Sequence, residues 1–322
     1  VQYYLAANYQ HDTGILKESA ENQFNNNINI NRLQVRSNVT INLTPNTEAV
    51  VRAYGSFDNT TGPIQGGAQV FSMARNASPV RFLPYYPADE AHREVKHILF
   101  GASEQAGVYV NPLAQVISGY KDSSSSMMLL QLELQHNFDK IVKGLFAKGT
   151  YNVKRDSYYD MRRRYRPYYY APLATTDGSY RLMNFNPDTG TEYLDFEDGG
   201  KNIISTMYGE MRVGYNRTFN DLHDINAVLV GSLRHEVNTY GVSTLQESLP
   251  LRNISSAGRF AYGYDSRYFL EFNFGYNGSE RFSKNHRFGF FPSVGAGWLV
   301  SNENFMSGVS DVISNLKLKA TY

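Results

Sequence analysis

The chain has 322 residues, a formal net charge of +1 and no cysteine. Its length allows one large β domain or two smaller ones, and its near-neutral charge argues against nucleic acid as the main partner. The absence of cysteine excludes disulfide scaffolds and thiolate metal sites. Aromatic residues make up 14 % of the chain although the mean hydropathy is −0.44, which suits an apolar outer belt around a hydrated interior.

Alternation of apolar and polar side chains predicts β-strands from the first residue onward. The segment 268–276 shows the pattern most clearly, because its even positions are large and apolar while Glu271, Asn273 and Gly275 are not. Such a strand has one apolar face and one polar face. The expected strands lie at 1–9, 33–43, 49–57, 128–137, 145–153, 207–216, 225–235, 258–265, 268–277, 287–299 and 315–322.

The connections between these strands fall into two classes. Gly, Pro, Asn and Asp mark tight turns at one end of the array, whereas long polar segments connect the strands at the other end. Short helices are expected at 68–75 and 89–99 within the first very long connection. The tight turns lie near 44–47, 139–143, 220–224 and 265–267, and the long connections span 11–27, 58–126, 155–203 and 236–257.

This asymmetry is typical of a transmembrane β-barrel, in which short turns are periplasmic and long loops are extracellular. No run of 18 apolar residues occurs, so any membrane span must be a strand. We therefore predict an all-β fold, a transmembrane antiparallel β-barrel with about eleven strands here. Residues 1–322 form a single partial barrel domain, with long extracellular loops at about 58–126 and 155–203.

A barrel in lipid must close, and bacterial single-chain barrels have even strand numbers. Eleven strands leave an unpaired edge, and the chain begins and ends within alternating segments. We expect the chain to be roughly half of a larger barrel and a piece of something longer.

The segments 36–52, 74–87, 277–306 and 313–322 resemble the barrel of the SusC/RagA family of TonB-dependent outer-membrane transporters. The run GFFPSVGAGW at 289–298 carries the most specific part of the resemblance. The match covers the early and middle barrel only, so the plug domain, the TonB-contacting segment and the final strands are expected outside this chain.

The resemblance implies a 22-stranded barrel in the bacterial outer membrane that imports oligosaccharides or peptides. It further implies a SusD-like surface lipoprotein as a lid, the TonB complex as the energy source, and contact with outer-membrane lipid. It implies neither an enzyme nor a nucleic-acid partner.

The run at 289–298 has two unlike faces. Its even positions are mostly large and apolar, whereas Gly289, Ser293, Gly295 and Gly297 leave the other face almost bare. Bare positions let another element approach closely, and in this family a plug occupies the lumen, so we predict a plug-facing lumen wall. Alternatively, the glycines relieve curvature at a barrel bend. Pro292 lacks a backbone donor, so a bulge or a break in pairing is also expected there.

The densest unusual cluster is the Tyr- and Arg-rich segment 158–170. Rings stack on sugars or peptide side chains and guanidinium groups bind carboxylates, so this composition suits a polymeric substrate or a protein partner. Tyrosines that pack an ordered loop, or that belong to an extracellular aromatic girdle, are the alternative. The candidate substrate- or partner-binding residues are Arg81, Tyr85, Tyr86, Arg162, Arg163, Arg164, Tyr165, Arg166, Tyr168 and Tyr169.

Other chemistry has little support in the sequence. Asp195, Glu197 and Asp198 could ligate Ca²⁺ in a surface loop, but they lack EF-hand spacing, and solvated loop charge is the favoured interpretation. His92 and His97 are five residues apart and would diverge on a helix. No nucleophile elbow or carboxylate pair is identifiable, so we predict no cofactor, no metal and no catalysis.

Two rival functions stay open at this point. A passive porin or structural outer-membrane barrel would share the strand pattern without energy coupling. A soluble β-rich protein that binds or cleaves glycans would share the composition, although a propeller should show repeats of about 40 to 50 residues. No such repeat is visible.

Overall fold

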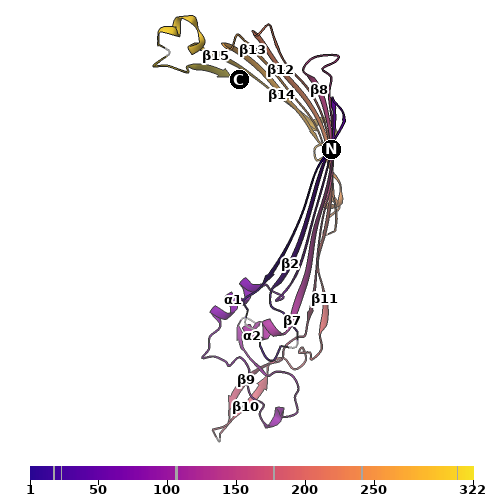
Figure 1. Ribbon diagram of the computed structural model, residues 1–322. Helices are drawn as coiled ribbons and strands as arrows, with labels where there is room; N and C mark the ends of the chain where they lie inside the picture. The colour runs from indigo at the N-terminus through magenta and orange to yellow at the C-terminus, as the bar shows by residue number, and fades with distance from the viewer. Residues whose placement is uncertain (17–18, 23, 106–107, 177, 241, 310) are drawn as a thin grey trace.

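The computed structural model describes residues 1–322 except 17–18, 23, 106–107, 177, 241 and 310. The described residues form an eleven-stranded antiparallel sheet, together with a three-stranded and a two-stranded sheet. The large sheet is a curved wall that stays open, because its first and last strands each pair on one side only (Figure 1). The prediction of an antiparallel β-barrel with about eleven strands is thereby confirmed for a partial barrel.

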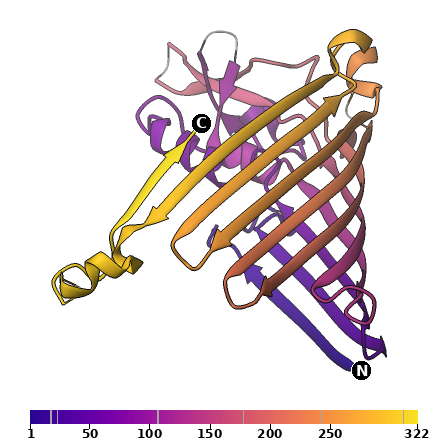
Figure 2. The same ribbon diagram turned by 90° about the horizontal axis from the view of Figure 1, so that it is seen from above.

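Every strand of the wall pairs with the next wall strand along the chain, so the topology is a meander (Figure 2). The segments between β3 and β7 and between β8 and β11 add small sheets outside the wall. The wall strands are β1 (Gln2–Thr13), β2 (Asn29–Thr44), β3 (Thr47–Gly62), β7 (Gly119–Asn137), β8 (Leu145–Arg164), β11 (Asp195–Phe219), β12 (His223–Tyr240), β13 (Leu251–Tyr264), β14 (Tyr268–Ser279), β15 (Phe288–Leu299) and β16 (Lys317–Thr321).

Tight turns join the strands at one end of the wall, here called the turn end. The β11–β12 and β13–β14 turns each place two residues in the left-handed region, with φ of 50° and 57° at Asn220 and Asp221 and 50° and 51° at Asp265 and Ser266. This backbone matches the twist of hairpin strands, and Asn and Asp tolerate it well. The tight turns expected from the sequence are present at all four places.

The wall strands extend farther toward the opposite end, the loop end, than side-chain alternation predicted. The ends of the expected loop 58–126 belong to strands, because β3 continues to Gly62 and β7 begins at Gly119. The same holds for the expected loop 155–203, because β8 continues to Arg164 and β11 begins at Asp195. Backbone pairing continues through polar segments such as Ser123–Ser126, where neither face is apolar. The four long connections also contain the residues outside the described part of the chain, apart from residue 310.

The two faces of the wall differ in a way that is unusual for a water-soluble protein. On β7 the apolar residues Leu130, Leu132 and Leu134 are 44 to 52 % exposed, whereas the intervening Gln131 and Glu133 are half-buried. The same holds on β14, where Phe272 is 41 % exposed. We call these the apolar face and the polar face. Single exposed apolar residues are ordinary, but a continuous face of them marks contact with another apolar phase or partner.

A longer connection, 300–316, lies at the turn end and folds back over the β13–β14 turn. Glu303 accepts hydrogen bonds from the Tyr268 hydroxyl at 2.7 Å and from Trp298 Nε1 at 2.9 Å, and Arg267 lies 3.4 Å from its other oxygen. The bonds from Tyr268 and Trp298, with the charge of Arg267, lower the pKa of Glu303 below its ordinary value. The carboxylate therefore ties three aromatic and cationic side chains together at the end of the wall. The short helices η3 (Val300–Asn302) and η4 (Asn304–Val309) belong to this connection.

Of the two helices predicted within the first long connection, one is confirmed and one is wrong. The expected helix at 68–75 is present as α1 (Gly67–Asn76). The expected helix at 89–99 is wrong, because only the single turn η1 (Glu90–His92) forms there. The neighbours Ile98 and Leu99 pack against two different clusters, which an extended chain permits and one helix face does not.

Among the described residues no helix is long enough and apolar enough to cross a membrane. The remaining elements all belong to the connections at the loop end. They are β4 (Phe100–Gly101), β5 (Ser103–Gln105), β6 (Val108–Val110), α2 (Pro112–Ile117), β9 (Tyr169–Ala174), β10 (Tyr180–Asn184), α3 (Leu245–Ser248) and η2 (Lys284–His286).

Candidate functional site

The polar face of the wall is crossed by ion pairs between neighbouring strands. Glu133 on β7 pairs with Arg52 on β3 and, at 2.8 Å, with Lys148 on β8, and its side chain is only 10 % exposed. Farther along the wall, Arg259 on β13 pairs with Glu271 on β14 at 2.9 Å. Charges that pair across strands keep this face hydrated and fixed in register. The alternation in the sequence predicted the polar face, but not which charges meet.

The loop end carries a folded cap, which we define as the described residues of 63–118 and 165–194. It brings together two segments that are far apart in the sequence, because β4 pairs in parallel with β9 and β9 pairs with β10. Figure 1 shows α1, α2, β9 and β10 gathered beyond one end of the wall strands. The cap is therefore one packed unit built from two loops.

Aromatic residues form the interior of the cap. Tyr170 is 1 % exposed, and its hydroxyl lies 2.8 Å from His97 Nε2 and 3.3 Å from the amide nitrogen of Asn184. Tyr165 is shielded as well, and burial, followed by the nearby Tyr169, raises its pKa to about 12. One core cluster contains Tyr86, Leu99, Tyr170 and Leu182, and another contains Phe100, Ala102, Ala114, Ile117 and Tyr169.

Two polar side chains that the sequence analysis missed hold the cap together. Asn111 is fully buried, donates to the carbonyls of Pro84 at 2.7 Å and Gly101 at 2.5 Å, and caps α2 by accepting from the amide of Ala114. Asp89 accepts from the amide of Leu182 at 2.8 Å. Burial opposes ionisation of Asp89, but the bonds from Leu182 and His92 outweigh it and lower its pKa. Asn111 before Pro112 is a helix-capping signal that can be read from the sequence. No sequence signal indicates the contacts that Asn111 and Asp89 make with distant segments.

The predicted binding residues take different positions in the structure and do not form one cluster. Tyr86 and Tyr169 are 7 % and 6 % exposed and pack in the cap core, so the packing interpretation applies to them. Arg81, Tyr85 and Arg166 are exposed on the cap. Tyr168 stacks on the ring of His97 at 4.1 Å between centroids.

The three arginines Arg162–Arg164 were expected in a loop but lie at the end of β8. Backbone pairing with β7 and β11 on both sides extends the strand through them. Arg162 pairs with Asp160 at 3.2 Å, Arg163 with Asp122 at 3.6 Å and Arg164 with Glu197 at 2.5 Å. Their charges are thus offset within the wall, and the free positive charge of the segment is smaller than its composition suggests.

A buried carboxylate explains the irregular pairing beside these arginines. Asp160 is 5 % exposed and accepts from the hydroxyl of Tyr158 and the amide of Gly200, each at 3.0 Å. The strand β11 bulges between Asp198 and Lys201 to reach it, and a Cβ at Gly199 would lie 1.8 Å from an oxygen of Asp160. Glycine is required at Gly199 because the backbone passes this close.

The candidate calcium ligands lie in strand β11 rather than in a surface loop. Glu197 is held by Arg164 and Asp198 by Lys201 at 2.8 Å, while Asp195 is exposed. Alternation along a strand directs Glu197 and Asp198 to opposite faces. Within the described part of the chain, no group of three His, Asp or Glu residues is placed to hold a metal ion.

The run 289–298 forms β15, and its small residues face the polar side of the wall. Ser293, Gly295 and Gly297 line a hollow of about 410 Å³ together with Arg259, Glu271, Lys317 and Lys319. Gly289 differs, because the ring of Phe291 lies over it and a Cβ there would come within 2.7 Å of that ring. The bare face therefore covers only the part of β15 near the turn end.

The predicted bulge or break in pairing at Pro292 is wrong for the β14–β15 pair. β14 and β15 stay in continuous register from Tyr268–Trp298 to Gly278–Phe288, with Phe274 opposite Pro292. The amide of Val294, two residues farther along, donates to the carbonyl of Tyr322. The nitrogen of Pro292 therefore points to that same side of β15, away from β14, and no bond between β14 and β15 is lost. A proline is tolerated where no ladder bond is needed.

The wall is an antiparallel meander with an exposed apolar face and an ion-paired polar face. It has tight turns at one end and a folded cap at the other. Together these features define the class of protein. The chain is a part of a transmembrane β-barrel.

Comparison with known proteins shows which transmembrane β-barrels this chain is similar to. Over its full length the chain is 22 % identical to TonB-dependent receptor P26 of Formosa agariphila, and over 168 residues it is 28 % identical to receptor P39 of the same organism. A stretch of 66 residues is 44 % identical to TonB-dependent receptor SusC of Bacteroides thetaiotaomicron. The alignments cover 31 %, 16 % and 6 % of these relatives and 100 %, 44 % and 20 % of this chain. No protein-family model matches.

Among solved structures, the fold is similar to that of the RagAB peptide transporter, with a TM-score of 0.57 at 16 % identity. That match covers 95 % of this chain and 33 % of the other. The open-open state of the RagAB peptide importer gives a TM-score of 0.56 at 17 % identity, covering 99 % and 34 %. The chain is thus similar to the barrel of TonB-dependent receptors of the SusC/RagA type, and it spans about a third of the length of the relatives that it matches throughout.

Proposed function

We propose that this chain forms part of the wall of an outer-membrane importer that takes up nutrients with energy from the TonB complex. The observation that carries the proposal is the full-length similarity to a TonB-dependent receptor in a chain whose wall exposes its apolar face. In a lipid bilayer that face contacts acyl chains, and the ion-paired polar face lines a hydrated lumen. No cofactor and no catalytic step are part of the proposal.

We further propose a SusD-like lipoprotein lid above the cap and an oligosaccharide or peptide as cargo. A protein similar in fold is described as a peptide transporter, and a protein similar in sequence is the receptor SusC. The exposed Arg81, Tyr85 and Arg166 supply the ring and guanidinium groups that interfaces and polymer-binding surfaces favour. Similarity to TonB-dependent receptors favours this proposal over a passive porin.

A soluble glycan-binding protein agrees less well with the wall. Such a protein would expose the ion pairs and bury the leucines, whereas here Leu132 is 44 % exposed while Glu133 is 10 % exposed. Burying apolar surface is the main driving force of folding in water, so a soluble fold would have the opposite arrangement.

The topology is tested by epitope tags in the full-length protein. A tag at Gly178, in the turn between β9 and β10, should bind antibody on intact cells, because we place the loop end outside. A tag at Asn46, in the β2–β3 turn, should bind antibody only after the outer membrane is permeabilised. The reverse labelling would invert the barrel, and equal labelling of both sites on intact cells would contradict the membrane assignment.

The lid and cargo are tested by changing Arg81, Tyr85 and Arg166 together to Ala in the full-length protein. Anchor residues at an interface contribute ~2 kcal/mol or more each, so co-purification with the lid or growth on the cargo should fall more than about tenfold. Lys140 and Lys143 at the turn end, changed together to Ala, serve as the control and should leave both unchanged. Wild-type co-purification and growth in the triple variant would exclude these residues from the site.

A further inference from the structure

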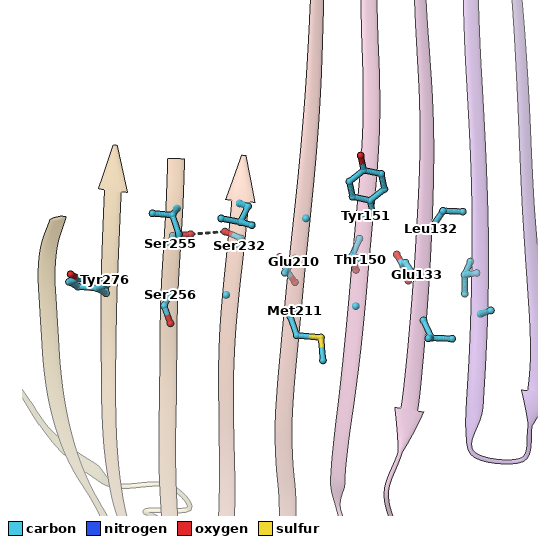
Figure 3. Close-up of a pocket in the computed structure, with 18 of the residues that line it drawn as sticks. Leu132, Glu133, Thr150, Tyr151, Glu210, Met211, Ser232, Ser255, Ser256 and Tyr276 are labelled. Atoms are coloured by element: carbon cyan, nitrogen blue, oxygen red, sulfur yellow. Dashed lines mark hydrogen bonds between the residues drawn. The ribbon is translucent and has the colours of Figure 1, made fainter. Parts of the chain in front are cut away.

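The apolar face carries a hollow of about 830 Å³ in the middle of the wall, between Ala49 on β3 and Phe288 on β15. Figure 3 shows the side chains of Leu132, Tyr151 and Met211 on three neighbouring strands and that of Tyr276 farther along the same wall. The hollow exists because glycines replace side chains on three adjacent strands. A Cβ at Gly209 or Gly231 would meet no atom within 4 Å, and at Gly149 it would meet only the sulfur of Met211, at 3.9 Å.

A second hollow of about 650 Å³ continues from the first toward the loop end. The two hollows share Tyr151, Gly209, Leu233, Ile254 and Phe288, so they form one groove. The lining changes along it, from aliphatic and aromatic residues over the glycine floor to charged residues at the far end. That end is lined by Arg234, His235, Arg252 and Arg287 and by a single acidic residue, Glu280.

Two of these residues belong to the apolar face. His235 and Arg252 are register partners on β12 and β13, two residues beyond the register pair Leu233 and Ile254. Arg252 is 55 % exposed, and its one ion pair among the described residues is a long one, 3.5 Å to Glu280. Nε2 of His235 is buried and has no hydrogen-bond partner in the described part of the chain. The groove thus ends beside an exposed guanidinium with one long ion pair and an imidazole nitrogen that no described residue satisfies.

A cation on the lipid side of a barrel is costly at the bilayer centre, and the cost falls toward the interface. Arg252 lies beyond Ile254, the last apolar residue on this face of its strand, which is the position expected for a cation near the membrane interface on the loop side. A molecule that fills this groove must be apolar along the glycine floor and anionic at the end. Phosphate meets the second requirement, because guanidinium binds it through parallel charge-assisted hydrogen bonds.

We propose that this groove binds a phosphate-bearing membrane lipid, with an acyl chain over Gly149, Gly209 and Gly231 and the phosphate beside Arg252 and His235. The proposal rests on the proposed function, since this face meets lipid only in a membrane-inserted barrel. A second copy of the chain would also bury an apolar groove, but apolar contact alone gives no use to the cationic end. Charge complementarity therefore selects the lipid.

The test uses the full-length transporter purified in detergent, with lipid A and its dephosphorylated form as probes in native mass spectrometry. The wild type should retain lipid A. The double variant Arg252→Gln with His235→Gln should retain about tenfold less, as expected for the loss of charge-assisted bonds, without losing the dephosphorylated probe. Arg281→Gln, an exposed arginine outside the groove, is the matched control and should behave as wild type.

Filling the groove tests the acyl-chain part separately. Gly209→Leu with Gly231→Leu should reduce retention of both probes, and the milder Gly231→Ala keeps the test valid if the double variant assembles poorly. Unchanged lipid A retention in the Arg252 and His235 variant, full displacement of lipid A by inorganic phosphate, or loss of a dimer rather than of lipid in the filled variant would each overturn the proposal. Outer-membrane fractionation of the wild type is scored first. Failure there defeats the proposed function, whereas correct fractionation with unchanged retention defeats only the lipid site.

Discussion

Phe272→Arg should prevent the full-length protein from assembling in the outer membrane. Phe272 lies in the middle of β14 on the apolar face, 41 % exposed, with its ring 6.2 Å from that of Phe274. A guanidinium there faces hydrocarbon, at a cost of roughly 2–4 kcal/mol near the bilayer midplane, and the inserting barrel has no water with which to solvate it. The measurement is the amount of heat-modifiable barrel in the outer-membrane fraction, which should fall to a small part of the wild-type level.

The neighbouring residue provides the matched control. Asn273 lies on the polar face, donates to Glu271 at 2.9 Å and is the register partner of Arg259. An arginine at this position would meet the carboxylate of Glu271 and water, so Asn273→Arg should assemble normally. If both variants assemble equally well, the assignment of the apolar face to lipid is wrong.

Tyr170→Ala should open the cap while leaving the barrel intact. The ring is 1 % exposed among Tyr86, Leu99 and Leu182, and removing a buried aromatic side chain costs about 3–5 kcal/mol, a large share of the stability of so small a unit. The wall does not depend on this ring, because its strands are held together by pairing with their neighbours in the sheet. Trypsin added to intact cells should therefore cut the variant within the cap much faster than wild type, with unchanged barrel assembly.

Two further variants separate packing from other causes. Tyr170→Phe keeps the ring and loses the hydroxyl bonds to His97 and Asn184, so it should cost only about 1 kcal/mol and protect the cap nearly as well as wild type. Tyr180→Ala, on the 45 % exposed Tyr180 of the adjacent strand β10, should have no effect. Equal cleavage of wild type and Tyr170→Ala would show that the cap is not a cooperative core.

The boundaries of the loops show where side-chain patterns stop being informative. Along 268–276 every second residue is apolar, and that segment became β14 within a few residues of its predicted ends. At Ser123–Ser126 and Arg162–Arg164 both faces are polar, so nothing in the side chains distinguishes strand from loop. The backbone bonds to neighbouring strands decide these residues, and such bonds depend on segments far away in the sequence.

The candidate site follows the same division. Composition singled out the Tyr- and Arg-rich segment, but the same residue types serve as core at Tyr169, as wall ion pairs at Arg163 and as exposed surface at Arg166. A tyrosine can pack in a core as well as contact a ligand, because its ring is apolar and its hydroxyl is polar. Which role each residue takes depends on what the other loop brings to it.

The sequence by itself determined the β class, the strand number, the turn end and the two faces of the wall, because each is a local property of alternation and turn chemistry. Only the tertiary structure decided how far the strands run, which charges pair across them and that two loops fold into one cap. It also revealed the groove on the apolar face, since glycines on three strands form a hollow only when pairing sets them side by side. Strand register is a relation between distant segments, and no single segment contains it.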